Sequence, residues 1–214
     1  MADAMPMPFS PYAGAEDRSL LRRLGLAPGT LPAGGNWYPE DRTLEALLDL
    51  TETLAPTRVL MLNGGLAVAV LARALSGRAE ISVVDHDVQS IRLTRTLLEA
   101  SGASDHVRFV EAELQDYDKH NLWYDRYALA SLPGPFDLIF IDGPPHFCGR
   151  MPRWPAGAEL FHKLARGGVV VLDKAQRVKE KKALKRWAET FPDLVQSRLK
   201  RGGGAVVLQA ASQD

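Results

Sequence analysis

Short apolar runs alternate with amphipathic segments from residue 57 onward. The runs cover residues 58–62, 81–85, 107–111, 136–142 and 169–173. Runs of this length, bounded by polar turns, are typical of parallel strands that are buried on both faces. Between them, apolar positions recur at helical spacing and predict helices at 67–75, 88–100, 156–165 and 177–191. This alternation predicts repeated β-α-β units in a doubly wound α/β sheet.

The two ends of the chain have different patterns. Segments 194–199 and 205–209 are separated by a short stretch with three glycines, which is too short for a crossover helix and predicts an antiparallel hairpin. Leucines at helical spacing after Pro39 predict a helix that covers the sheet. Residues 1–36 are rich in Pro and Gly, with one short predicted helix at 16–24. We therefore divide the chain into an N-terminal arm or lid, 1–36, and one domain, 37–214.

The composition is that of an ordinary globular protein. Of the 214 residues, 46% are hydrophobic and 24% are charged, which excludes a disordered tail, a fibrous repeat and a membrane bundle. The 26 Lys and Arg balance the 26 Asp and Glu, so no net charge attracts the chain to nucleic acid or lipid. Basic residues gather in 150–201, but no aromatic side chains are interleaved as a platform for bases. We expect a solvated helix there rather than a nucleic-acid site.

The single cysteine and the N-terminal segment bear on cellular location. Cys148 has no partner for an intrachain disulfide. No apolar run precedes the first basic residue, Arg18, and the longest apolar stretch is too short to span a bilayer. We expect a cytoplasmic protein that does not enter a membrane. The sequence leaves the oligomeric state open, including a homo-oligomer.

The predicted strands end in polar residues, and ligands of an open α/β sheet bind at the carboxyl ends of its strands. The first strand ends in Asn63-Gly64-Gly65, which either lets the backbone approach a ligand closely or simply makes a tight turn into the next helix. This turn matches neither the dinucleotide fingerprint nor the P-loop. Asp85 follows Gly65 by 20 residues and ends the second strand, where an acid is placed to accept the hydroxyls of a ribose.

Four segments and the terminal hairpin together carry a family resemblance. The segments are Val59-Leu-Met-Leu-Asn-Gly-Gly-Leu, Ser82-Val-Val-Asp-His-Asp, Phe136-Asp-Leu-Ile-Phe-Ile-Asp-Gly-Pro-Pro and Gly168-Val-Val-Val-Leu-Asp. In this order they resemble class I S-adenosylmethionine-dependent methyltransferases, over about residues 36–210. Trp123-Tyr124-Asp125 and Asp173-Lys-Ala-Gln-Arg177, followed by Glu180 and Trp187, are similar to a bacterial branch of the small-molecule type.

The resemblance implies a seven-stranded Rossmann-like methyltransferase sheet with a C-terminal antiparallel hairpin, and S-adenosylmethionine as the cofactor. It also implies which residues bind that cofactor. These are Asn63, Gly64 and Gly65 beside the methionine half, Asp85 at the ribose, Ala112 and Glu113 at the adenine, and Asp142 near the transferable methyl group.

The chain departs from the family pattern at three positions. The family usually has an acid where Met61 stands and a glycine where Asn63 stands, so the amino-acid end of the cofactor loses a usual anchor. Related metal-dependent O-methyltransferases have an acid after the fourth strand and two adjacent acids after the fifth. Asp142 and Asp173 match this pattern, but Lys174 replaces the second acid of the pair. Because an ammonium group opposes a divalent cation, we expect no catalytic metal.

Methyl transfer from a sulfonium requires an aligned nucleophile, exclusion of water and, where needed, removal of a proton. His146 is the candidate base, because it lies on the loop after the fourth strand and an imidazole titrates near neutral pH. Asp142, Asp173 and Lys174 complete the predicted catalytic set.

Substrate contacts are predicted on two segments. Arg150, Arg153 and Arg177 are candidates to grip an anionic acceptor, although arginines near a loop are more often solvated. Trp37 and Tyr38 follow the Pro- and Gly-rich segment and are candidates to roof the acceptor pocket.

We therefore expect an S-adenosylmethionine-dependent methyltransferase that acts on oxygen or nitrogen of a small-molecule substrate. The alternative is a catalytically inactive methyltransferase-like binding or scaffold protein, which the residues at Met61, Asn63 and Lys174 motivate. A nicotinamide-dependent oxidoreductase is disfavoured by the absent fingerprint and by the terminal hairpin.

Overall fold

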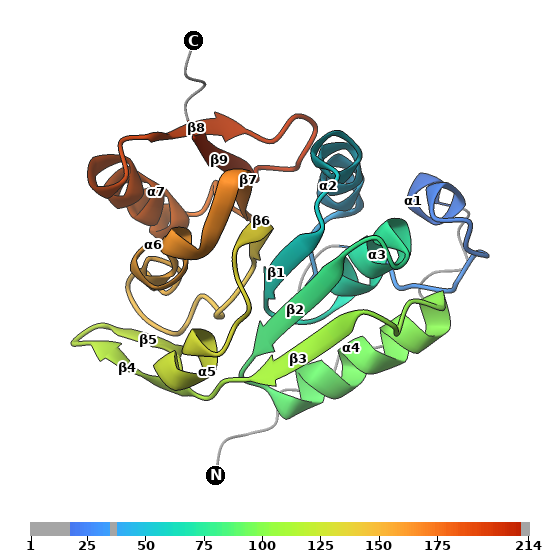
Figure 1. Ribbon diagram of the computed structural model, residues 1–214, viewed down its shortest axis with the longest axis horizontal. Coiled ribbons are helices and arrows are strands. Elements are labelled where there is room, and N and C mark those ends of the chain that lie inside the picture. Colours follow the sequence, from blue (N-terminus) through green and yellow to red (C-terminus); the bar gives the residue numbers. More distant parts are fainter. Residues whose placement is uncertain (1–17, 35–37, 211–214) are drawn as a thin grey trace.

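The computed structural model describes residues 18–34 and 38–210 and contains a central seven-stranded sheet (Figure 1). The strand order is β3-β2-β1-β6-β7-β9-β8. The strands are β1 (Arg58–Leu62), β2 (Glu80–Asp85), β3 (Val107–Glu111), β6 (Phe136–Ile141), β7 (Leu164–Leu172), β8 (Leu194–Arg198) and β9 (Val206–Ala210). The predicted seven-stranded sheet is confirmed.

The carboxyl ends of β1 and β6 lie next to each other near the middle of the sheet, because these two strands are adjacent and parallel. β1, β2, β3, β6 and β7 are parallel, and β9 alone runs antiparallel to both of its neighbours, β7 and β8. The chain moves outward from β1 to β3, then returns to β6 on the other side of β1. A reversal of strand order leaves a crevice at the carboxyl ends of the two central strands, which is where such sheets bind ligands.

The helices cover both faces of the sheet (Figure 1). α2 (Asp41–Leu54), α3 (Leu66–Leu75) and α4 (Val88–Ser101) pack on one face, and α6 (Pro155–Leu160) and α7 (Val178–Thr190) pack on the other. Successive side chains of a strand point to opposite faces, so β1 sends Val59 and Met61 into the first core and Leu60 and Leu62 into the second.

Most predicted elements occur within a few residues of their expected positions, and two segments differ. The helix predicted at 156–165 ends at Leu160, continues as a 3-10 turn (Phe161–Lys163), and gives way to β7 five residues before the predicted strand. The chain between β3 and β6 forms a separate hairpin, β4 (Leu114–Asp118) and β5 (Asn121–Tyr124), followed by the short helix α5 (Arg126–Ala130). These three elements are not predicted by the sequence pattern.

The described part of the predicted arm packs against the domain. α1 (Ser19–Arg23) places Leu20 and Leu21 in the first core, and Leu31 is also fully buried there. Arg18 donates to both carboxylate oxygens of Asp41 at 2.9 Å, which ties the segment to the start of α2. A domain boundary at residue 36 and a lid function for 1–36 stay predictions.

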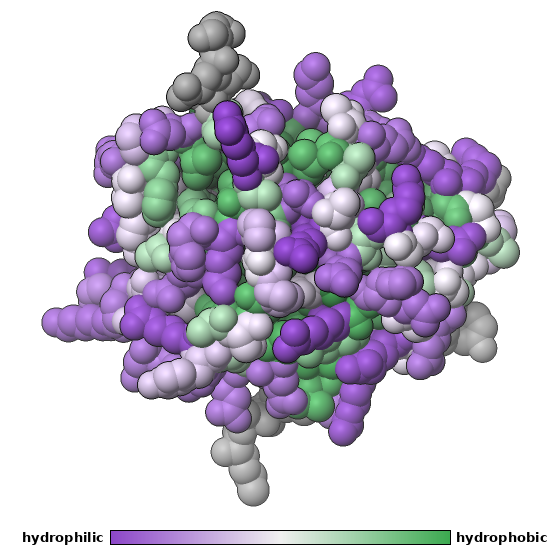
Figure 2. All heavy atoms as spheres, in the orientation of Figure 1, coloured by the Kyte–Doolittle hydropathy of each residue, from purple (hydrophilic) through white to green (hydrophobic). Residues whose placement is uncertain are grey.

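The surface is mainly polar. On the face shown in Figure 2, hydrophilic side chains surround smaller hydrophobic patches. The large apolar side chains that are most exposed are Tyr127, Val178, Phe147 and Val195. Within 18–34 and 38–210, no helix combines the length and the apolar character that a membrane crossing requires.

Candidate active site

Three neighbouring strands bring the predicted catalytic residues to one place. Asn63, Asp142 and Asp173 directly follow β1, β6 and β7, which are adjacent in the sheet. A cavity of about 370 Å³ opens beside these strand ends and is lined by Asn63, Asp142, His146, Lys174 and Arg177, among others. We call it the first cavity. Residues separated by more than a hundred positions in sequence therefore face one pocket.

Two carboxylates and one ammonium group form the charged centre of the site. Lys174 Nζ lies 3.8 Å from Asp142 Oδ1 and 3.8 Å from Asp173 Oδ2. Burial raises the pKa of Asp173 to about 6, and the negative charge of Asp142 contributes, whereas Lys174 and Arg153 act in the opposite direction. A carboxyl group that titrates close to neutral pH can accept a proton during a reaction and release it afterwards.

Arg153, which the sequence offered as a candidate to bind an anionic acceptor, is instead buried within the protein. Its side chain is buried, and its guanidinium donates to the carbonyl oxygen of Asp173 at 2.8 Å and to Asp142 Oδ1 at 3.0 Å. The guanidinium is thus engaged within the protein and is not free to grip an acceptor. Arg150 is exposed, and Arg177 is exposed beside the first cavity.

Tyr38 lines a second cavity, of about 300 Å³, which shares Lys174 and Arg177 with the first cavity. Asp173 also borders it, as does the turn before β9 at Gly203. This position agrees with a role for Tyr38 in walling an acceptor pocket. Trp37, the other predicted roof residue, lies outside the described residues.

The glycine turn after β1 packs tightly against other parts of the chain. Gly64 N–H donates to Asp85 Oδ2 at 2.7 Å, and Gly65 N–H donates to Thr94 Oγ1 at 2.7 Å. Gly65 has φ +106°, and a Cβ there would lie 2.9 Å from the ring of Tyr38. The turn therefore requires glycine for its own geometry, and both of these N–H groups are engaged by side chains of the protein.

Asp85 is fully buried and ionised. Burial by itself would raise the pKa of Asp85, but the nearby His86 imidazole and hydrogen bonds from Ser90, Asp87 N–H and Gly64 N–H lower it overall. Ser90 Oγ donates to Oδ2 at 2.7 Å, and Asp87 N–H donates to Oδ1 at 3.0 Å. Because this carboxylate has no exposed surface, a ribose reaches it only if a covering side chain moves.

Two buried polar atoms near Asp85, Trp123 Nε1 and Tyr124 Oη, have no hydrogen-bond partner within the described residues, and His86 Nδ1 lies beside them, 3.3 Å from Asp85 Oδ1. Their rings are neighbours, since the ring centroids of His86 and Tyr124 are 6.3 Å apart and those of Trp123 and Tyr124 are 5.1 Å apart. The pKa of Tyr124 is raised well above its usual value by burial first and by Asp85 second. Buried polar groups without partners are costly, so a polar ligand such as a nucleoside fits the chemistry of this corner.

The remaining predicted residues lie at the margins of the site. Ala112 is buried, Glu113 is exposed, and both follow β3. His146 is exposed on the rim of the first cavity, with its ring centroid 5.8 Å from that of Phe147. His146 is therefore not part of the buried charged centre.

Sequence reasoning missed three residues of the site. Tyr124, Arg153 in its internal role, and Glu180 all contribute to its buried polar groups. Tyr124 and Glu180 belonged to the segments that carried the family resemblance, but no property of the sequence indicated what they would contact.

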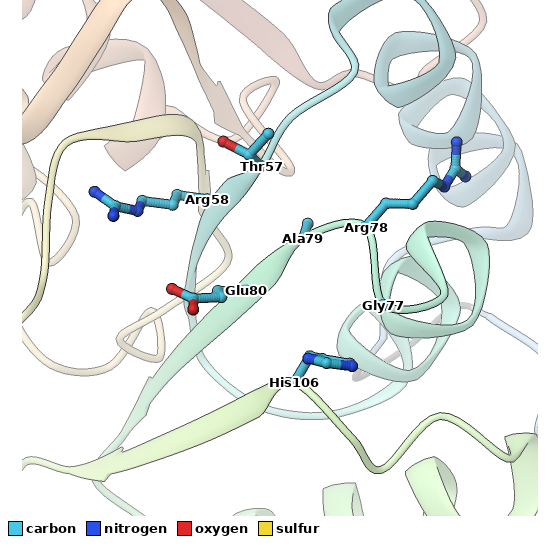
Figure 3. Close-up of a pocket in the computed structure, with 7 residues that line it drawn as sticks. All are labelled: Thr57, Arg58, Gly77, Arg78, Ala79, Glu80 and His106. Carbon is cyan, nitrogen blue, oxygen red and sulfur yellow. The ribbon is translucent and has the colours of Figure 1, made fainter.

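Another cavity, of about 360 Å³, lies at the opposite edge of the sheet, where β1 and β2 begin (Figure 3). Arg58 and Glu80 point to one side of it and Arg78 to the other (Figure 3). Arg78 Nη2 donates to the carbonyl oxygen of Ala74 at 2.7 Å, at the end of α3. These side chains diverge, so they do not converge on a common ligand.

The described residues contain no group of three or more His, Cys, Asp or Glu side chains arranged to hold a metal ion. At the ends of β6 and β7, where the resemblance to metal-dependent O-methyltransferases implies a third acid, the structure has the ammonium group of Lys174. Independence from a metal stays a prediction that requires a measurement.

Solved structures with the same fold include several methyltransferases. The O-methyltransferase TomG from Streptomyces achromogenes, solved in complex with SAM, matches with a TM-score of 0.60 at 16% identity over 94% of this chain and 93% of that one. An O-methyltransferase from Bacillus cereus, solved in complex with SAH, gives 0.58 at 17% over 91% and 92%. A methyltransferase from Geobacter sulfurreducens gives 0.60 at 16% over 90% and 85%. At these identities the likeness establishes the fold.

The sequence also matches a family model described as a methyltransferase domain, over residues 62–175. This segment includes the glycine turn, Asp85 and the charged centre at Asp142, Asp173 and Lys174. No curated protein sequence matches the chain. The family match and the fold together confirm the resemblance drawn from the sequence. This chain therefore belongs to the methyltransferase domain family, with the sheet of the class I methyltransferases.

Proposed function

We propose that this protein is an S-adenosylmethionine-dependent methyltransferase that methylates an oxygen or nitrogen atom of a small molecule. The observation that carries the proposal is the position of Asp142, Asp173 and Lys174 at adjacent strand ends, beside two cavities and within the segment that matches the family. Two structural neighbours were solved with SAM or SAH, which supports the choice of cofactor.

We assign the cofactor to the crevice between the glycine turn and the end of β6. Asp85 would accept the ribose hydroxyls, and the unpartnered hydroxyl of Tyr124 beside it would supply a further hydrogen bond. Ala112 and Glu113, after β3, would border the adenine, and the turn at 63–65 would lie along the methionine half. Tyr38 covers Gly65, so we expect it to shift when the cofactor enters.

When bound, S-adenosylmethionine supplies an electrophilic methyl group on a sulfonium. Asp173 would take the proton from the acceptor hydroxyl or amine, because its pKa of about 6 leaves it ionised at neutral pH yet able to be protonated. The ammonium group of Lys174, 3.8 Å from a carboxylate oxygen of each aspartate, would offset the negative charge of both. His146, on the rim of the first cavity, is a second candidate base for an acceptor bound in that cavity.

The acceptor is proposed to be small and to carry a negative charge. The two cavities, of about 370 and 300 Å³, meet at Lys174 and Arg177. The guanidinium of Arg177 makes no hydrogen bond or ion pair with the described residues, so it is available to a carboxylate or phosphate. Exposed Phe147 and Val178 lie near the rim and would contact an apolar part of the acceptor.

A catalytically inactive binding protein is the second candidate. It is favoured by the closed state of the cofactor corner, where Asp85 has no exposed surface and Tyr38 lies against Gly65. It is also favoured by Met61, which is fully buried in the first core and provides no polar anchor for the cofactor. In this case the cofactor would bind without methyl transfer.

The test is transfer of a radiolabelled methyl group from S-adenosylmethionine to a panel of hydroxyl- and amine-bearing metabolites, with and without EDTA. We expect product in both conditions and at least a hundredfold less product with Asp173→Asn, which removes the proposed base. Asp193→Asn, at an exposed aspartate between α7 and β8, should leave product formation unchanged. Loss of turnover in EDTA would contradict the role of Lys174. Binding of the cofactor without product from any acceptor would favour the binding protein.

A further inference from the structure

One buried guanidinium joins the ends of two strands of the site. Arg153 lies just before α6, and its side chain is 3% exposed. Nη1 donates to the carbonyl oxygen of Asp173 at 2.8 Å, and Nη2 donates to both the carbonyl oxygen and Oδ1 of Asp142. Asp142 and Asp173 are the first residues after β6 and β7. The same group therefore fixes the backbone of both acids and one carboxylate oxygen of Asp142.

Glu180 faces the remaining nitrogen of this guanidinium. It belongs to the first turn of α7, is 1% exposed, and places Oε1 3.8 Å from Arg153 Nε. Arg153 Nε and both carboxylate oxygens of Glu180 make no hydrogen bond within the described residues. A buried carboxylate is costly unless an opposite charge compensates it. The pairing of Glu180 with Arg153 therefore links α7 to the two strand ends.

We propose that Arg153 and Glu180 are positioning residues of the methyl-transfer site. Arg153 orients Asp142 and Asp173 toward the two cavities, and Glu180 holds Arg153 in place and offsets part of its charge. The proposal rests on the proposed function for the role of the two aspartates. The arrangement itself exists in the protein without any ligand, so it can be tested without turnover.

The charge state of Asp173 distinguishes a positioning role from a purely structural one. Asp142 raises the pKa of Asp173, whereas Lys174 and Arg153 lower it. Removal of the charge of Arg153 should therefore raise this pKa, and removal of the charge of Glu180 should lower it, because Arg153 is then less neutralised. The other charged or titratable groups that line the second cavity with Asp173 are Tyr38, Glu40 and Arg177.

The experiment is a carbon-13 NMR titration of the side-chain carboxyl groups in the full chain without ligand. The Asp173 signal is assigned as the one that is missing in Asp173→Asn. The variants are Arg153→Gln, Arg153→Lys and Glu180→Gln. Arg166→Gln and Glu189→Gln are matched controls, because both residues are exposed and lie on β7 and α7.

We expect Arg153→Gln to raise the pKa of Asp173 by about one unit and Glu180→Gln to lower it by about half a unit. Arg153→Lys keeps the charge, so it should leave the titration near that of the unaltered protein, as should both controls. In methyl-transfer assays, the acid limb of the pH profile of kcat should shift in each variant by the same amount as the pKa of Asp173. In Arg153→Lys this limb should lie where it lies in the unaltered protein, while kcat itself stays reduced.

An Asp173 titration that is unchanged in both Arg153→Gln and Glu180→Gln would overturn the positioning proposal, whether or not methyl transfer is observed. If Arg153→Gln does not fold, Glu180→Gln decides, because it keeps the shape of the side chain: a lowered pKa supports the proposal and an unchanged one overturns it. Opposite shifts in the two variants without methyl transfer to any acceptor would support the proposed arrangement and overturn the proposed function.

Discussion

At the scale of single residues, two buried aspartates at the same edge of the sheet have pKa values that are shifted in opposite directions. Burial raises the pKa of both Asp85 and Asp173. At Asp85, the adjacent His86 imidazole and hydrogen bonds from Ser90 and from two backbone N–H groups outweigh burial, so its pKa is lowered overall. Asp173 Oδ2 has no hydrogen bond within the described residues and faces Asp142, so its pKa rises to about 6. The first is suited to hold a ligand and the second to exchange a proton.

Asp85 is expected to support both the fold and the cofactor. Asp85→Ala leaves the donors at Gly64, Asp87 and Ser90 without their acceptor, so it should lower the free energy of unfolding by about 2–3 kcal/mol at pH 7. It should also weaken cofactor binding at least tenfold. Urea unfolding and calorimetric titration with S-adenosylhomocysteine measure the two effects.

The stability contribution of Asp85 should also depend on pH. Because its folded pKa lies below the unfolded value, the contribution is present above about pH 4 and is lost as the pH falls through the folded pKa. Asp87→Ala is the control: it removes the cap at Gln89 N–H and should cost about 1 kcal/mol without changing cofactor affinity. Unchanged affinity in folded Asp85→Ala would contradict the ribose assignment.

Asp173, the proposed catalytic base, is expected to lower the free energy of unfolding when it is ionised. Its raised pKa means that ionisation opposes folding, so the cost appears as the pH rises through the unfolded value near 4 and is complete above about 6. Asp173→Asn should therefore raise the free energy of unfolding by about 1–2 kcal/mol at pH 8 and leave it nearly unchanged at pH 4. Urea unfolding at both pH values measures this difference. An effect of Asp173→Asn on the free energy of unfolding that is the same at both pH values would show that the pKa of Asp173 is not raised in the folded protein.

At the scale of elements, the described residues 18–34 pack against the rest of the protein. α1 and the turn after it bury Leu20, Leu21 and Leu31 against α2, and Arg18 bridges to Asp41 and to the carbonyl oxygens of Leu31 and Pro32.

Leu21→Ala tests this attachment. Truncation of a fully buried leucine leaves a cavity and should lower the free energy of unfolding by about 2–4 kcal/mol. Leu122→Ala, on β5, is the control, because Leu122 is 37% exposed and its loss should cost less than about 1 kcal/mol. Similar urea midpoints for the two variants would mean that the segment of α1 detaches from the core in solution.

The elements that the sequence predicted well have a strong local pattern of apolar residues. β1, β2, β6 and β7 contain apolar runs that are largely buried, and α4 has one apolar face and is followed by Gly102 with φ +63°. The hairpin of β4 and β5 escaped prediction because its first strand, Leu-Gln-Asp-Tyr-Asp, is short, polar and partly exposed. Its stability depends on contacts of Trp123 and Tyr124 with the second core, which no local pattern reveals.

The candidate site was predictable only in part for a related reason. The residues at strand ends, such as Asp142 and Asp173, follow from the topology, because parallel strands end at one edge. The roles of Arg153 and Glu180 depend on distances across three elements, and an arginine on a loop has the same sequence signature whether it is buried or exposed.

At the scale of the whole molecule, the site exists only when the sheet is complete. Asn63, Asp142 and Asp173 follow β1, β6 and β7, and Asp85 ends β2. Arg177, directly before α7, and Tyr38 complete the walls of the cavities. A ligand that bridges several of these strand ends binds the folded state and not the unfolded chain. Its binding must therefore stabilise the entire fold, which links cofactor recognition to a global measurement.

S-Adenosylhomocysteine at a hundredfold excess over its Kd should raise the free energy of unfolding by about 2.7 kcal/mol. For a chain of this size that corresponds to a Tm increase of roughly 5–10 °C in a thermal scan. NAD should give no increase, because the turn at 63–65 lacks the dinucleotide fingerprint. Asp85→Ala should shift less than the unaltered protein at the same ligand concentration, each compared with its own ligand-free Tm. A Tm that rises with NAD and not with S-adenosylhomocysteine would contradict the cofactor assignment, because the closed corner around Asp85 and Tyr124 would then open for a different nucleotide.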